Sequence, residues 1–401
     1  MDLLIFQNKN FGLLWFGQLV SQLGDKVFQI AMMWYVLELT GSSRYVSYVL
    51  FFNLLPVVLL AAFSGVLVDR MNKKMIIVLS DLLRGMIVIG ISWMVFTENA
   101  GIPHVLSAIF FLGCFTALFN PAISASVPLI SGREKLGTAM AWQSSLRDMS
   151  AIFGAGIGGV LVSMFGITVS FFINGISYVL SAVFELPISI PEVKKDIRTG
   201  FFSDLREGFD FVFHNRTLKH MLILFMIMNF FGPPVMIIIP VMVKRLSLSA
   251  GYLGYFEMSL ALGSLLGALT VNRITPKDSM VGFISFQMFA SGLVLAAIGF
   301  FGTPLYIITL QFIMGITLAY ININLMILFQ KSTPDEMKGR FFSILETFSI
   351  LVVPISFLIF GITVDKFGYV RNLWLMGGAI CLSSLYFLII PGIKDVVKND
   401  T

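Results

Sequence analysis

The chain has 401 residues, of which 57% are hydrophobic and only 12% are charged, and its mean hydropathy is +0.90. Soluble globular proteins carry about 25% charged and about 45–50% apolar residues, so this composition predicts a protein that crosses a membrane many times. It excludes soluble enzymes, nucleic-acid-binding modules and secreted disulfide scaffolds. The net charge of +5 is explained by cationic loops on one side of the membrane.

Twelve apolar runs follow one another along the chain, each long enough to approach or exceed the ~20 residues that a helix needs to cross the hydrocarbon core. They span residues 11–39, 45–68, 75–97, 103–130, 138–164, 167–187, 218–243, 250–271, 279–301, 304–330, 341–364 and 370–391. The first run is too long for a cleavable signal peptide, so we expect it to insert as the first span. The sequence therefore predicts an all-α integral membrane protein with twelve transmembrane helices.

The cationic residues predict the orientation of these spans. With the N-terminus in the cytoplasm, nineteen Lys and Arg residues fall in cytoplasmic connections and five fall in the opposite ones. Cytoplasmic loops carry the excess of positive charge, so both termini are expected to be cytoplasmic. The expected location is the cytoplasmic membrane of a bacterium.

One polar connection, over residues 189–217, divides the chain. Its apolar residues between Phe202 and Phe213 recur at helical spacing, which predicts an amphipathic helix on the inner leaflet. The predicted domains are an N-terminal six-helix bundle at 1–188, this cytoplasmic connection, and a C-terminal six-helix bundle at 218–401.

The two halves resemble each other, which indicates an internal repeat. Residues 6–9 match residues 213–216 at an offset of 207, and glycines match in four places at an offset of 202. The glycine pairs are Gly65 with Gly267, Gly137 with Gly339, Gly159 with Gly361, and Gly166 with Gly368. A parallel repeat of this kind predicts two bundles related by a pseudo-twofold axis along the membrane normal.

The first span carries a polar face. Gln18, Gln22, Asp25 and Gln29 are spaced by 4, 3 and 4 residues, which places them on one side of a helix. A charge at mid-bilayer costs about 2.5–3.5 kcal/mol on insertion scales and normally faces a cavity or a partner. Asp25 is therefore predicted to couple transport to protons, and the three glutamines to line a substrate cavity. The alternative is a structural ion pair of Asp25 with Lys26 or Arg147.

Later spans contain further polar residues. Gln143 and Arg147 are predicted to line the cavity, and Asp148, Glu257 and Glu346 are further candidates for proton coupling. The alternative for the two glutamates is polar packing within the C-terminal half. The three histidines and two cysteines form no pattern of metal ligands, so neither a metal nor a cofactor is expected.

The connection between spans 2 and 3 carries the most specific motif, Gly65-Val66-Leu67-Val68-Asp69-Arg70-Met71-Asn72-Lys73-Lys74. It resembles the loop signature of the major facilitator superfamily, Gly-x-Leu-x-Asp-Arg-x-Gly-Arg-Lys, with Asn72 and Lys73 as departures. The residues alone also fit a cationic turn that only sets orientation. The resemblance implies a cytoplasmic gate. Its residues would be Gly65, Asp69, Arg70, Lys73 and Lys74, with Asp81 and Arg84 beside them.

Span 5 carries a second motif, Ser150-Ala151-Ile152-Phe153-Gly154-Ala155-Gly156-Ile157-Gly158-Gly159. It resembles the exporter motif Gly-x-x-x-Gly-Pro-x-x-Gly-Gly of the same superfamily and keeps Gly154, Gly158 and Gly159. Ser150 and Ala155 replace the first Gly and the Pro, and small-residue helix packing is the alternative interpretation. The stretches 116–122, 127–130 and 334–343 resemble the macrolide-efflux and siderophore-exporter branch.

This resemblance implies a secondary transporter rather than an enzyme, working as a monomer by alternating access. It would export an amphipathic small molecule, such as a macrolide-like drug, a peptide antibiotic or a siderophore, against proton entry. Its expected partners are this substrate, protons and the lipid bilayer. Transport of a lysophospholipid or other lipid is one alternative, and a non-transporting membrane receptor or scaffold is a remote one. Intramembrane acids beside glutamines favour transport, because a scaffold gains nothing from them.

Overall fold

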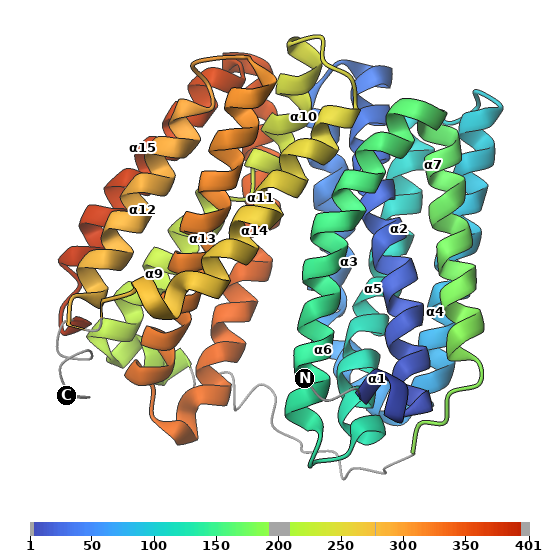
Figure 1. The fold of residues 1–401 in the computed structure, drawn as a ribbon, viewed down its shortest axis with the longest axis horizontal. Helices are drawn as coiled ribbons and strands as arrows, with labels where there is room; N and C mark the ends of the chain where they lie inside the picture. The colour runs from blue at the N-terminus through green and yellow to red at the C-terminus, as the bar shows by residue number, and fades with distance from the viewer. Residues whose placement is uncertain (1–3, 192–208, 277, 394–401) are drawn as a thin grey trace. The chain divides into compact units, whose positions relative to one another are not determined.

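The computed structural model describes residues 4–191, 209–276 and 278–393 (Figure 1), and every regular element within these ranges is a helix. The chain divides into two compact units. The first contains residues 1–197 and 243–258, and the second contains residues 198–242 and 259–401. The domain boundaries predicted at 188 and 218 stay a prediction, because much of the connection between them lies outside the described residues.

The described residues in the continuous part of the first unit form seven α-helices and a short π-helical turn. These are α1 (Leu4–Gln7), α2 (Lys9–Thr40), α3 (Ser43–Arg70), α4 (Lys73–Phe96), α5 (Ile102–Ser131), α6 (Leu136–Met149), η1 (Ser150–Gly154) and α7 (Ala155–Glu185). Residues 243–258 add the end of α10 (Val235–Arg245) and the start of α11 (Gly251–Ile274).

The part of the second unit that the structure describes contains the remaining helices and the rest of α10 and α11. Its other elements are α9 (Arg216–Phe231), α12 (Met280–Ala297), α13 (Pro304–Ser332), η2 (Asp335–Met337), α14 (Lys338–Phe367) and α15 (Tyr369–Leu388). Residues 209–214, at the end of the predicted amphipathic helix, are also helical. Val212 is fully buried there in the apolar core of this unit, whereas the start of that helix lies outside the described residues.

The helices account for twelve spans. Nine described segments are long and apolar enough to cross a membrane. One of them, residues 136–185, contains two spans, because the backbone leaves the helical conformation at Gly166. The helices α2 and α15, which are long but carry more polar residues, complete the set.

Residues matched by the internal repeat have the same local geometry in the two halves. Asn8 and Asn215 each cap a helix, since their side chains accept hydrogen bonds of 3.1 Å from the backbone N–H groups of Phe11 and Leu218. Gly166 and Gly368 interrupt equivalent helices with φ of 80° and 81°, a region that glycine enters without steric cost. The repeat therefore extends to where helices begin and break.

Close approaches at glycines bring three helices of the first unit together. α7 packs along both α2 and α4. A Cβ atom added to Gly24 of α2 would lie 2.5 Å from Oδ1 of Asn174, and one added to Gly85 of α4 would lie 3.0 Å from the carbonyl oxygen of Gly175. Small residues allow helix backbones to come this close in a membrane. Polar side chains next to these glycines can then meet inside the unit.

Candidate functional site

Charged and polar side chains from three helices meet inside the first unit. Asp25 comes from α2, Asp81 and Arg84 come from α4, and Tyr178 and Glu185 come from α7. Asp25 is partly buried, and each of the other four is at most 4% exposed. We refer to these five residues as the acid–arginine cluster.

Arg84 connects the two aspartates of the cluster. Its guanidinium forms an ion pair with Asp81 and lies 4.7 Å from the ring centroid of Tyr178 and 4.1 Å from that of Phe119. The Tyr178 hydroxyl donates a hydrogen bond to Asp25. The result is a continuous path from Asp81 through Arg84 and Tyr178 to Asp25, in which aromatic faces shield the arginine from water.

Glu185 is the least satisfied member of the cluster. It lies beside Asp81 and Ser181, but its carboxyl oxygens form no hydrogen bond of regular geometry with a described residue, and neither does Oδ2 of Asp81. Buried polar groups are normally paired. A carboxyl pair with unpaired oxygens can hold a proton between its members.

The cluster contains more acidic than basic groups. Three carboxyl groups surround a single guanidinium, and Lys26, next to Asp25 in sequence, forms its ion pair elsewhere. Uncompensated charge in a low-dielectric interior costs several kcal/mol per ion. Within the described residues, the cluster therefore holds three carboxyl groups and one guanidinium.

A second polar group lies on the same unit and involves Lys26. Its ammonium Nζ is 3.0 Å from Oε1 of Gln29 and 3.7 Å from Oε2 of Glu257, at the start of α11. The side chains of Lys26 and Glu257 are 31% and 29% exposed. Two candidates from the sequence, Gln29 and Glu257, therefore meet at Lys26, while Asp25 bonds to Tyr178 rather than to Lys26 or Arg147.

Within the described residues, the other predicted cavity and proton-coupling residues form no hydrogen bond or ion pair with the cluster. Gln18 is buried, and its Nε2 has no partner among the described residues, as is also true of the half-buried Gln143. Gln22 is half-buried, whereas Arg147, Asp148 and Glu346 are exposed. Their roles stay predictions.

The predicted gate motif is at the surface of the unit. Gly65, Asp69 and Arg70 are exposed in the last turns of α3, and neither Asp69 nor Arg70 forms an ion pair with a described residue. Lys73 and Lys74 follow in the first turn of α4, which Asn72 caps by accepting a 3.0 Å hydrogen bond from Met75 N. The gating role stays a prediction, and unchanged turnover in Asp69→Asn would contradict it.

The exporter-type glycines pack α7 against two neighbours. Added Cβ atoms on Gly154 and Gly158 would lie 2.8 Å from Cβ of Lys26 and 3.0 Å from Cα of Val27, both on α2. One on Gly159 would lie 2.8 Å from Cα of Gly254 on α11. Directly before these contacts the helix makes the π-helical turn η1. Such turns bend helices as prolines do. This one ends at Gly154, directly before Ala155, which replaces the proline of the exporter motif.

We expect Gly159→Ala to impair both stability and transport. The added methyl group would meet the backbone of Gly254, which cannot move aside as a side chain can, and overpacking of this kind costs about 1–3 kcal/mol. Thermal unfolding in detergent and vesicle transport would measure the effect. Gly90→Ala is the matched control, because a Cβ atom there has open space around it. Equal behaviour of the two variants would contradict the close contact.

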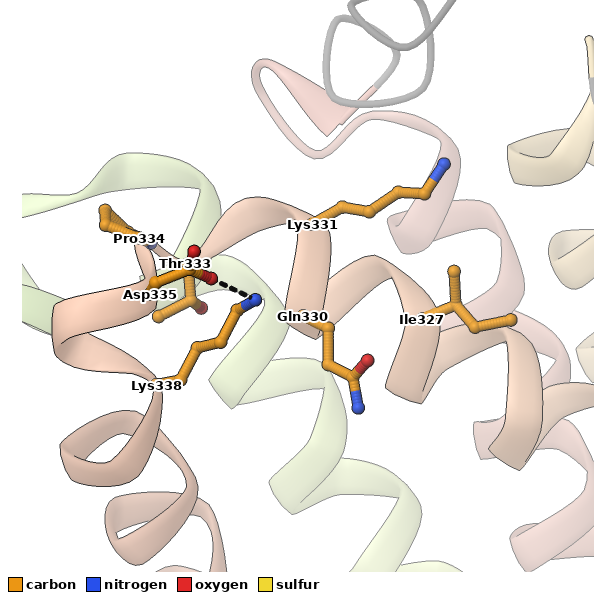
Figure 2. Close-up of a pocket in the computed structure, with 7 residues that line it drawn as sticks. All are labelled: Ile327, Gln330, Lys331, Thr333, Pro334, Asp335 and Lys338. Carbon is orange, nitrogen blue, oxygen red and sulfur yellow. Dashed lines mark ion pairs between the residues drawn. The ribbon is translucent and has the colours of Figure 1, made fainter.

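The second unit has a large surface hollow where α13 leads into α14. Figure 2 shows its lining residues, with the Lys338 side chain reaching Asp335 and Lys331 extending away from that pair. The hollow has a volume of about 460 Å³, and the ion pair measures 2.5 Å. Because Asp335 is almost fully exposed, the pair adds little stability. Three of its lining residues, Pro334, Asp335 and Lys338, belong to the stretch 334–343 that resembles the efflux branch.

Tyr178 and Glu185 belong to the site but not to the set predicted from the sequence. Asn174, Tyr178, Ser181 and Glu185 are spaced by 4, 3 and 4 residues, the same spacing as the polar face of span 1. This polar face of span 6 is the sequence feature that indicates Tyr178 and Glu185 as site residues. Asp81 and Arg84 were assigned to the gate by resemblance, whereas the structure places them with Asp25.

Comparison with known proteins assigns the chain to a family. The family model described as Major Facilitator Superfamily matches residues 14–352. Macrolide efflux protein A of Streptococcus pyogenes is 24% identical over 396 residues, covering 96% of each chain, and the staphyloferrin A transporter of Staphylococcus aureus is 21% identical over 92% of this chain and 93% of that one.

Solved structures agree on the fold. The crystal structure of a bacterial homologue of the iron transporter ferroportin, in the inward-facing state, matches with a TM-score of 0.77 at 13% identity, over 97% of this chain and 99% of that one. The predicted all-α, twelve-span fold class is confirmed, as is the prediction of a transporter rather than an enzyme. The chain belongs to the major facilitator superfamily.

Proposed function

We propose that this transporter exports an amphipathic small molecule of the macrolide type in exchange for protons, by alternating access. The acid–arginine cluster carries the proposal, because three carboxyl groups around one guanidinium provide a place for a transported proton. The efflux relatives support the direction of transport and the class of substrate. Their similarity of 21–24% identity over nearly the whole chain makes macrolides and siderophores the first compounds to test.

The path from Asp81 to Asp25 supports coupling at a distance. A proton that binds to Asp25 removes the negative charge that the Tyr178 hydroxyl stabilises, and it leaves Arg84 with fewer carboxylates to neutralise. The conformations of the transporter then differ in free energy by an amount that depends on proton occupancy, which is the requirement for coupling. Glu185 provides a second protonation site at the other end of the path.

Purified protein in proteoliposomes tests the proposal. When a pH gradient is imposed, a macrolide is expected to accumulate on the more acidic side, from which the protons leave. Accumulation should stop when an ionophore collapses the gradient. Macrolide binding without any response to the gradient would show that proton coupling is wrong. A response of proton flux to other substrates, without macrolide binding, would show that the substrate class is wrong.

The cytoplasmic placement of both termini gives a separate prediction. Asn99 and Glu134 are exposed in connections that the charge bias places on opposite sides of the membrane. In a background with Cys114→Ser and Cys381→Ser, Asn99→Cys is expected to react with an impermeant maleimide from outside intact cells, and Glu134→Cys only after the cells are opened. The reverse pattern would invert the orientation.

A further inference from the structure

The second unit encloses a cavity separate from the acid–arginine cluster. It has a volume of about 280 Å³ and is lined by residues of α9 to α13 and α15. Most of its wall is apolar, including Met228, Met314 and Leu318, and no lining residue is charged. Its size is just below the range of about 300–1,000 Å³ typical of small-molecule sites. It is large enough for a ring with one or two substituents.

A break in the membrane helix forms part of the wall. α9 ends at Phe231 and α10 begins at Val235, with Gly232, Pro233 and Pro234 between them. Prolines lack an N–H group, so the carbonyl groups four residues earlier, at Asn229 and Phe230, lose their usual helical donors. Irregular backbone at membrane depth is tolerated where it is buried in protein or lines a cavity, and Asn229, Gly232 and Pro233 all line this one.

One polar side chain in the wall has no protein partner. Gln311 is 5% exposed and lines the cavity, and its amide forms no hydrogen bond with any other part of the chain that the structure describes. Gln311, Met314, Leu318 and Asn322 follow at spacings of 3, 4 and 4 residues, so one face of α13 borders the cavity. Asn229, in contrast, is held by Ser349 and by the Phe225 carbonyl, at 3.1 and 2.9 Å.

We propose that this cavity binds an uncharged, largely apolar molecule or group that carries both a hydrogen-bond donor and an acceptor, such as an amide or an alcohol. The Gln311 amide supplies one donor and one acceptor toward it, and the methionine and leucine side chains cover its apolar part. A charged ligand is disfavoured, because no lining residue would compensate the charge. The proposal goes beyond proton-coupled export, since it assigns a binding site in the second unit whether or not protons drive transport.

Protection of a cysteine from alkylation tests this proposal with a matched pair of probes. In a Cys114→Ser, Cys381→Ser background, Met314→Cys places a thiol in the wall. The alkylation rate with N-ethylmaleimide is measured on purified protein in detergent, with benzamide or with benzoate, which has the same shape but is charged. Benzamide is expected to slow alkylation and benzoate is not. Adding Gln311→Leu is expected to weaken benzamide protection about tenfold, the effect of one lost hydrogen bond to a buried group.

The controls separate a selective site from an unselective cavity. A Cys381→Ser variant keeps Cys114, which lies in the first unit, as its single cysteine. Its alkylation rate should be the same with and without benzamide. Equal protection by benzamide and benzoate, or protection that survives Gln311→Leu, would overturn the proposal and indicate an unselective cavity. If Met314→Cys does not yield monodisperse protein, Leu318→Cys places the thiol in the same wall. Neither measurement depends on transport. A negative result would therefore leave the proposal of proton-coupled export intact, and a failure of proton-coupled export would leave the binding cavity intact.

Discussion

Asp25→Asn is expected to abolish macrolide accumulation driven by a pH gradient while leaving downhill exchange intact. The asparagine keeps the size of the side chain and can still accept the hydrogen bond from Tyr178, so the packing of α2 against α7 should survive. It cannot gain or lose a proton. Coupling free energies of about 1–3 kcal/mol correspond to effects of about 5–150-fold, and this is the size of the expected loss in gradient-driven accumulation.

Proteoliposome uptake with and without an imposed gradient measures this loss. Binding of an uncharged substrate should change little, and Asp25→Glu should retain part of the coupling. Asp148→Asn is the matched control, because Asp148 is an exposed acid of α6 without a place in the cluster. Accumulation at the level of the unaltered protein in Asp25→Asn would refute the assignment, and a loss in Asp148→Asn instead would transfer it to that residue.

The fold of this protein could be predicted almost entirely from its sequence, because apolar runs of membrane-spanning length leave few alternatives. The internal repeat predicted more than the number of spans. The matched residues Asn8 and Asn215 both proved to be helix caps, and Gly166 and Gly368 both proved to be helix breaks. Helix ends are determined locally, by a side chain that caps the helix or by a residue that tolerates positive φ. Such residues can be recognised in a short stretch of sequence.

The site was only partly predictable. Spacing showed that Gln18, Gln22, Asp25 and Gln29 share a face, but spacing does not tell which helix that face meets. Contact with Arg84 and Tyr178 depends on the approaches at Gly24, Gly85 and Gly175, which join segments some 60 to 150 residues apart. Glu185 shows the same limit, since an acid at the end of an apolar run fits a cytoplasmic loop equally well until its neighbours are known.

Arg84→Met is expected to cost the protein about 3–5 kcal/mol of stability, the usual loss when one partner of a buried ion pair is removed. Methionine has a similar length and packs well beside aromatic rings, so the apolar contacts with Phe119 and Tyr178 should partly survive. What is lost is the cation that interacts with all three acids, Asp25, Asp81 and Glu185. Arg147→Met is the matched control, and because Arg147 is exposed its expected effect is within about 0.5 kcal/mol.

The charge balance makes a finer prediction for the acids around Arg84. If Glu185 already carries a proton, Glu185→Gln replaces one neutral group by another and should change stability least. Asp81→Asn should cost more, because it removes the carboxylate that pairs with Arg84. In the Arg84→Met background the effect of Asp81→Asn on stability should change sign. There Asp81→Asn should recover part of the lost stability, because it removes a buried charge that has lost its partner. Denaturation of detergent-solubilised protein by SDS titration measures all four variants. Additive losses in the Arg84→Met, Asp81→Asn double variant would mean that the two residues do not stabilise each other, and the path from Asp81 to Asp25 would then lack its central link.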